Sequence, residues 1–271
     1  MAGLQRISIS SERRMSDILH LEPEQSHYLC RVLRLRRGDR FIALDEQDRS
    51  WIAALESDTC ATIVTAHSQP TELRCRVTLQ IAMPKAGMED IIRQTTELGA
   101  HAIQPVFSDR VVLKPSPNKL NRWQRVAQEA AEQSERQHWP RVAAALPWND
   151  VLKAPRVDPP QAGAVAKSIA AKSIVTRYIC TARHPAPHLL TRLAQMDALP
   201  AALNLATGPE GGWTADEVAR AVAAGYQPVS LGRRILRTVT APVVAMSLVA
   251  SVDDTFFAGS AFGSTTPLLN L

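Results

Sequence analysis

Residues 203–226 read LNLATGPEGGWTADEVARAVAAGY, a sequence that predicts a strand, a glycine-rich loop and a helix in direct succession. The apolar run 203–206 is typical of a buried strand, and the periodic stretch from Thr214 is typical of a helix. Thr214 with Glu217 three residues later has the pattern of an N-terminal capping box. A glycine loop between a strand and a helix favours a ligand held close to the backbone.

The loop itself, TGPEGGW at 207–213, does not have the residues of a phosphate-binding loop. It lacks both the lysine of a GxxxxGK[ST] motif and the spacing of GxGxxG. The carboxylate of Glu210 would repel a phosphate at close range. The loop therefore suits a ligand that is neutral or cationic where it meets Glu210. The alternative interpretation is that the glycines only make a tight turn between strand and helix.

Residues 230–242, SLGRRILRTVTAP, repeat the layout of strand, glycine, turn and helix. In a parallel sheet two such loops open at the same edge, which is where α/β proteins bind ligands. Arg233, Arg234 and Arg237 lie in this second loop. They are either part of a site or an ordinary solvated basic turn.

From Arg74 onward the sequence alternates between expected strands and helices. The expected strands are 77–83, 102–107, 174–180, 203–206 and 228–232, and the expected helices are 87–99, 119–137, 214–226 and 239–252. This alternation predicts an α/β fold with a mostly parallel sheet and helices on both faces. The segment 155–172 is expected to be a surface loop, and Gly99 is a natural helix stop.

The expected helix 119–137 carries two stripes at helical spacing. The apolar stripe is Trp123, Val126, Ala127 and Ala130, and the polar stripe is Glu129, Glu132, Gln133 and Arg136. Glu132 and Arg136 have the i,i+4 spacing of a surface ion pair. The alternative is that the polar stripe lines a functional site.

The first 70 or so residues predict a small β-rich module. Alternating apolar residues in 41–44 and 51–55 flank a polar turn, which is typical of a hairpin. The preceding stretch 26–35 has the spacing of one or two helical turns. Five arginines lie within RVLRLRRGDR, residues 31–40, and the polar segment 66–73 is a plausible domain boundary.

Composition narrows the class of protein. The chain has 271 residues and a formal net charge of +5, which is compatible with an anionic partner. It has no apolar stretch long enough for a membrane span and no secretory signal, so we expect a cytoplasmic protein. Its four cysteines are far apart without a CxxC pair, which favours reduced thiols and no metal.

The loops GPEGGW and LGRRILRTVTA, together with EAAEQSERQHWP, TTELGA and HYLCRVLRLRRGD, resemble the RsmE family over most of the chain, from about His27 to Val249. These are bacterial methyltransferases that modify N3 of one uridine in 16S ribosomal RNA. The resemblance implies a PUA-like β-barrel for RNA binding over 1–72 and a SPOUT domain over 73–258, with 259–271 a flexible tail. It also implies a trefoil knot, S-adenosylmethionine (SAM) bound in the knot, and a homodimer.

The resemblance also implies roles for individual residues. Those expected to bind the cofactor are Thr181, Thr207, Gly208, Gly211, Leu231, Gly232, Ile235 and Leu236. The chemistry of the reaction, rather than the resemblance, makes Arg237 the best candidate to stabilise the uridine anion, with Arg136 second and Glu210 as a nearby carboxylate. Contact with RNA is expected from Arg31, Arg34, Arg36, Arg37 and Lys85.

One position departs from the family pattern. The pattern LRTETA reads LRTVTA here, so that Val239 stands where a glutamate is expected. Besides methylation of uridine N3, this leaves two alternatives open. The chain is a SPOUT methyltransferase of another RNA or of a ribose hydroxyl, or it is an RNA-binding or ribosome-assembly relative with little activity.

Overall fold

The computed structural model describes residues 4–45, 47, 49–67, 71–109, 115–154, 175–182 and 184–257. Within it the chain forms two compact units, one of residues 1–72 with 128–139 and one of residues 73–127 with 140–271. The expected loop 155–172 and the expected tail 259–271 lie outside the described residues. None of the helices in the described part of the chain is long and apolar enough to cross a membrane.

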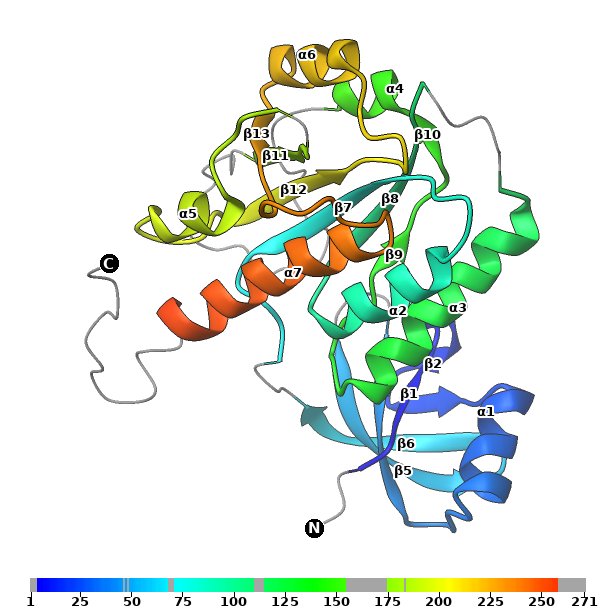
Figure 1. The fold of residues 1–271 in the computed structure, drawn as a ribbon. Coiled ribbons are helices and arrows are strands. Elements are labelled where there is room, and N and C mark those ends of the chain that lie inside the picture. Colours follow the sequence, from blue (N-terminus) through cyan, green and yellow to red (C-terminus); the bar gives the residue numbers. More distant parts are fainter. Residues whose placement is uncertain are drawn as a thin grey trace. The chain divides into compact units, whose positions relative to one another are not determined.

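The first unit is built on a six-stranded curled sheet (Figure 1). Its strands are β1 (Arg6–Ser8), β2 (Arg14–Met15), β3 (Ile18–His20), β4 (Arg40–Leu44), β5 (Ser50–Ser57) and β6 (Cys60–His67), in the order β1-β4-β5-β6-β3-β2. β4 and β5 pair antiparallel, as predicted for the hairpin. Alternate residues of these strands, such as Phe41, Ala43 and Ala53, are fully buried in the unit's core.

Short helical segments precede the hairpin. They are η1 (Ser11–Arg13), α1 (Pro23–His27) and the π-helical turn η2 (Tyr28–Val32), which confirms the helical turns predicted within 26–35. Leu29 is fully buried, while the arginines that follow it are exposed. Arg34 has a positive φ of 58°, so the chain turns away from the helical path before β4.

The last turns of α3 (Pro117–Gln133) and the following residues to Trp139 belong to this first unit. Glu132 accepts hydrogen bonds from the backbone N–H of Ser8 at 2.7 Å and from its hydroxyl at 2.6 Å. Burial raises the pKa of this carboxyl, and the bonds from Ser8 oppose that shift. Glu132 therefore points to β1 and not to the next helical turn.

Arg136 also contacts another residue, so Glu132 and Arg136 do not form the surface ion pair that is one of the two interpretations of their spacing. Its buried guanidinium lies 2.5 Å from the carboxylate of Glu72, which also accepts the backbone N–H groups of Gln137 and His138. The helix ends at Gln133 instead of 137, and Glu135 has a positive φ of 59°. The contact with Glu72, 64 residues away in sequence, outweighs the local pairing because the buried guanidinium requires a counter-charge.

The second unit contains a seven-stranded sheet whose strand pairs are all parallel. Its strands are β7 (Arg76–Ala82), β8 (Ala102–Phe107), β9 (Arg141–Val142), β10 (Leu146–Pro147), β11 (Thr176–Cys180), β12 (Ala202–Thr207) and β13 (Gln227–Val229). The order is β10-β8-β7-β12-β11-β13, with β9 paired to β8. The parallel sheet predicted from strand–helix alternation is confirmed; the knotted path stays a prediction.

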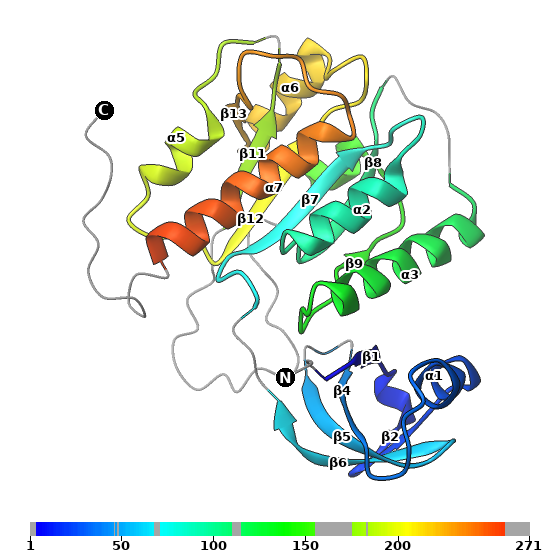
Figure 2. The ribbon, with the colours of Figure 1, turned by 60° about the horizontal axis from the view of Figure 1, so that its bottom comes forward.

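Helices cover both faces of this sheet, as predicted (Figure 2). The helices are α2 (Met88–Glu97), α3, α4 (Trp148–Leu152), α5 (Leu189–Ala194), α6 (Ala215–Ala223) and α7 (Thr240–Val252), which continues into the turn η3 (Asp253–Phe257). Tyr178 and Leu205 pack in the core cluster with α2, α3, α5 and α7, whereas their neighbours Ile179 and Ala206 pack with α4 and α6. Because side chains alternate along a strand, these two sets of helices lie on opposite faces.

The predicted capping box is present at the start of α6. The hydroxyl of Thr214 accepts the N–H of Glu217 at 3.1 Å, and the Glu217 carboxylate accepts the N–H of Thr214 at 2.8 Å. The second oxygen of Glu217 accepts the N–H of Asp109, in the loop after β8, at 2.8 Å. The carboxylate therefore fixes both the start of the helix and a neighbouring loop, which explains why it is fully buried.

Candidate cofactor pocket and active site

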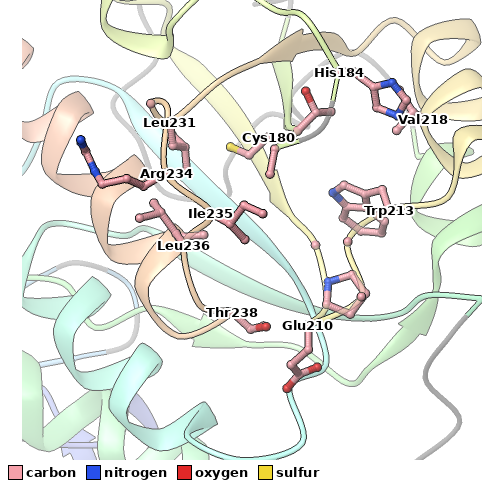
Figure 3. Close-up of a pocket in the computed structure, with 18 residues that line it drawn as sticks. Cys180, His184, Glu210, Trp213, Val218, Leu231, Arg234, Ile235, Leu236 and Thr238 are labelled. Carbon is pink, nitrogen blue, oxygen red and sulfur yellow. The ribbon is translucent and has the colours of Figure 1, made fainter.

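A pocket opens at the carboxyl ends of β11, β12 and β13, in the second unit (Figure 3). Three loops line it, one after each strand. The lining residues are Cys180, Thr181, Ala182, His184, Gly208, Pro209, Glu210, Gly211, Gly212, Trp213, Val218, Leu231, Gly232, Arg234, Ile235, Leu236, Thr238 and Ala241. The two glycine loops predicted to open at one edge of the sheet therefore meet at one pocket.

The loop after β12 is shaped around the indole of Trp213. A Cβ atom on Gly208 would lie 3.1 Å from Trp213 Nε1 and 3.3 Å from its backbone nitrogen, so a larger residue there would require Trp213 to shift. The indole stacks on Trp148 of α4 with ring centroids 4.8 Å apart, and Trp148 in turn meets Tyr226 edge-on. Trp213 is thus held as a fixed wall of the pocket.

Glu210 lies at the tip of this loop, with an exposed side chain. Its Oε1 atom accepts the backbone N–H of Lys85, in the loop after β7, at 2.9 Å. β7 and β12 are neighbouring parallel strands, which brings the two loops together. The backbone N–H of Lys85 therefore orients the Glu210 carboxylate without a partner side chain.

The opposite wall is the loop after β13. Gly232 has a φ of +120°, a conformation that favours glycine, and its N–H is 3.1 Å from the hydroxyl of Ser230. Ile235 is 71% exposed, which is unusual for a large apolar side chain and leaves it available to a ligand. Val239, at the end of the loop, packs on Gly87 before α2.

Several polar atoms of the pocket wall have no hydrogen-bond partner within the described residues. They are Thr181 Oγ1, Trp213 Nε1 and Thr238 Oγ1. Such groups each cost about 1–3 kcal/mol when left unsatisfied. Their gathering at one pocket therefore indicates the place of a ligand with polar groups. No group of three or more His, Cys, Asp or Glu side chains in the described ranges is arranged to hold a metal ion.

Cys180 is the thiol in the pocket wall. Burial raises its pKa to about 12, so the thiol stays protonated at neutral pH. A protonated thiol is a poor nucleophile, which argues against covalent catalysis through this side chain.

Most residues predicted to bind a cofactor line the pocket. These are Thr181, Gly208, Gly211, Leu231, Gly232, Ile235 and Leu236. Thr207 does not line it, because it is the fully buried last residue of β12.

The three predicted catalytic residues are placed differently. Glu210 lines the pocket, whereas Arg237 is exposed and is not one of the lining residues. Arg136 belongs to the first unit, where it is buried beside Glu72, and it is not one of the lining residues. The catalytic roles of all three stay predictions.

Some lining residues were missed by sequence reasoning. His184 follows β11 in a loop without a motif, and no sequence signal points to it. Trp213 and Thr238 lie inside the two quoted loops, and only the packing reveals that their polar atoms lack partners.

The residues expected to contact RNA are all exposed. Arg31 lies in η2, and Arg34, Arg36 and Arg37 lie between η2 and β4. Arg37 makes an exposed ion pair with Glu56 at 3.3 Å. Lys85 is exposed in the loop that holds Glu210. Exposed cations of this kind are compatible with an anionic partner.

Comparison with known proteins identifies the family. Residues 71–250 match an RNA methyltransferase domain, and residues 21–59 match an RNA methyltransferase PUA domain. The chain is 45% identical over 247 residues to ribosomal RNA small subunit methyltransferase E of Synechocystis, covering 90% of this chain and 76% of the relative. The Bacillus subtilis protein of that name is 30% identical over 238 residues, covering 84% and 87%.

The fold agrees with a solved structure of the same family. The crystal structure of ribosomal RNA small subunit methyltransferase E from Neisseria gonorrhoeae, bound to S-adenosyl methionine, has a TM-score of 0.75. It is 26% identical and covers 92% of this chain and 98% of its own. The resemblance predicted from the two loops is thereby confirmed, and the chain belongs to the RsmE family of ribosomal RNA small subunit methyltransferases.

Proposed function

We propose that this protein methylates N3 of a uridine in small-subunit ribosomal RNA, with SAM as the methyl donor. The observation that carries the proposal is the pocket at the ends of β11, β12 and β13, which combines glycine backbone, apolar side chains and Glu210. When bound, SAM supplies an electrophilic methyl group on a sulfonium cation. The carboxylate of Glu210 disfavours a phosphate ligand and is compatible with a cationic one.

The residues of the pocket fit this cofactor. Gly208 contributes backbone to the pocket wall, and Ile235 offers exposed apolar surface to an adenine ring. The unpartnered hydroxyl of Thr181 is available to a polar group of the ligand. Residues that would hold the cofactor are Thr181, Gly208, Gly211, Leu231, Gly232, Ile235 and Leu236.

The chemistry of the pocket favours a nitrogen over a carbon as the methyl acceptor. Uridine N3–H is a weak acid, and its anion needs only proton removal and charge stabilisation. Methylation at a pyrimidine carbon would instead use an added nucleophile, and the Cys180 thiol is protonated because burial raises its pKa to about 12. Arg237, exposed in the loop after β13, is the cation that we assign to the uridine anion.

We assign RNA binding to residues 1–72, through the exposed arginines 31, 34, 36 and 37, and methyl transfer to residues 73–258. Phosphate contacts of this kind give affinity that falls steeply with salt. Replacing Arg34 and Arg37 by Ala should therefore weaken RNA binding and reduce the slope of log affinity against log salt by about 2. An unchanged slope in a filter-binding titration would count against this surface. We also place the protein in the cytoplasm, as a homodimer, and Lys85 near the RNA.

A second candidate is an RNA-binding relative with little activity, favoured by Val239, whose apolar side chain packs on Gly87. One experiment separates the candidates. The purified protein is incubated with labelled SAM and small ribosomal subunits that lack the modification, and the product nucleoside is mapped. The proposal expects 3-methyluridine. A ribose methyl, or SAM binding in calorimetry without transfer, would replace it by one of the alternatives.

A further inference from the structure

Glu210 and Thr238 lie at one end of the pocket. Figure 3 shows both side chains at this end, with His184 and Val218 at the other. Among the described residues that line the pocket, Glu210 is the single carboxylate. Thr238 is 6% exposed, and its hydroxyl has no partner within those residues. A buried hydroxyl of this kind indicates that a polar group of a ligand docks here.

The carboxylate of Glu210 is held at one oxygen and open at the other. Oε1 accepts the N–H of Lys85 at 2.9 Å, and within the described chain Glu210 makes no ion pair. A side-chain rotation would break the bond to Lys85, so Oε2 keeps a defined direction. An exposed carboxylate with one free oxygen is available to accept a proton from a substrate.

The loop 84–87, whose Lys85 N–H binds the carboxylate of Glu210, is anchored at both ends. Met83, at its start, donates its N–H to the carbonyl of Val106 at 2.9 Å. Gly87, at its end, has a φ of +84° and lies under the side chain of Val239. Pre-organisation of this kind lowers the cost of orienting a catalytic group during reaction.

We propose that Glu210 is the proton acceptor for uridine N3–H, an inference that rests on the proposed function. The N3 proton passes to Oε2 of Glu210, and the N3 electron pair forms the bond to the methyl carbon. The carbon–sulfur bond breaks, its electron pair stays on sulfur, and the proton is later released to water. Lys85 acts through its backbone N–H, as a positioning group for Glu210.

The test is the substitution Glu210→Gln, which keeps the size of the side chain and removes its basicity. We expect kcat to fall at least about 100-fold, since general bases contribute roughly that much or more. The dissociation constant of SAM in calorimetry should change less than about 3-fold, a factor worth under about 0.7 kcal/mol. Asp216→Asn is the matched control, because Asp216 is an exposed carboxylate of the same segment that does not line the pocket, and it should leave kcat unchanged.

Two further readouts separate a base from a structural group. The kcat of Glu210→Gln should rise with pH, because hydroxide then removes the proton. RNA with 5-fluorouridine at the target should restore at least about a tenth of the lost rate, since fluorine makes N3–H more acidic and reduces the need for a base. Glu210→Asp, which keeps a carboxylate, should retain the wild-type pH profile.

Several outcomes would overturn the inference. A kcat within 3-fold of the wild type would do so. A lost rate that neither high pH nor 5-fluorouridine restores would also overturn it. A large loss of SAM affinity with an unchanged pH profile would overturn it too, because Glu210 would then be a counter-ion of the sulfonium. Failure of the proposed function looks different, because the wild-type protein itself would then produce no 3-methyluridine.

Discussion

Replacing Thr181, whose hydroxyl has no partner within the described residues, by Val should raise the stability of the free protein and weaken SAM binding. Thr181 follows β11, is 6% exposed, and its Oγ1 atom has no partner within the described residues. Replacing it by Val keeps the shape of the side chain and removes a buried polar atom. We expect the free protein to gain about 1 kcal/mol in unfolding free energy, because the penalty of an unsatisfied group is removed. For a protein of this size that corresponds to roughly 2 °C in Tm.

The same substitution should weaken SAM binding. If the hydroxyl bonds the cofactor, its loss costs about 1.4 kcal/mol, or a tenfold larger dissociation constant in calorimetry. Thr95→Val is the matched control, because the Thr95 hydroxyl is fully buried and already donates to the carbonyl of Ile91 at 2.7 Å. That variant should lose about 1 kcal/mol and keep its SAM affinity. A destabilised Thr181→Val protein with unchanged SAM affinity would refute the argument.

Three other predictions concern packing and charge. Gly208→Ala would place its Cβ 3.1 Å from Trp213 Nε1, so we expect a loss of about 1–3 kcal/mol in stability and a weaker SAM complex, and an unchanged Trp fluorescence spectrum would contradict this. Glu72→Gln removes the carboxylate charge that contacts the buried guanidinium of Arg136, and urea unfolding should show a loss of about 2 kcal/mol, whereas no loss would exclude a structural role for the pair. Burial and nearby Arg6 lower the pKa of His67, so the unfolded chain binds a proton first. Stability should therefore fall as the pH drops below 6.5, and His67→Gln should reduce that slope.

The sequence predicted those parts of the fold that depend on local signals. The strand, loop and helix of 203–226 formed as expected because the capping pair Thr214 and Glu217 and the glycines act over a few residues. The helices α4 and α5 were missed, since segments of five and six residues are too short to show a period. The end of α3 was placed too late, because Arg136 is bound by Glu72 from a distant part of the sequence.

The site was predictable to a similar degree. Both glycine loops were found from sequence, because a tight turn restricts which residues can occupy it. The stack of Trp213 on Trp148 was not predictable, since it depends on α4 lying on the same sheet face as α6. The bond from Lys85 to Glu210 likewise requires that β7 and β12 are neighbours, and local sequence does not predict the order of strands in a sheet.

The side chain at position 239 contacts the loop whose Lys85 N–H binds Glu210. A carboxylate there would lie against the loop 84–87, because a Cβ atom on Gly87 would be only 2.7 Å from the side chain of Val239. That loop already orients Glu210 through the N–H of Lys85. A second acid would add charge repulsion near Glu210 without adding a new function.

We therefore expect Val239→Glu to leave kcat within about 3-fold of the wild type, provided that Glu210 is the base. A gain of 10-fold or more in single-turnover methylation, about 1.4 kcal/mol of barrier, would instead show that the valine limits activity and would favour the weakly active relative. Val239→Gln is the control, because it has the length of glutamate without its charge. A gain in the glutamate variant alone would assign the deficit to the missing carboxylate, whereas equal rates in all three proteins would mean that Glu210 suffices.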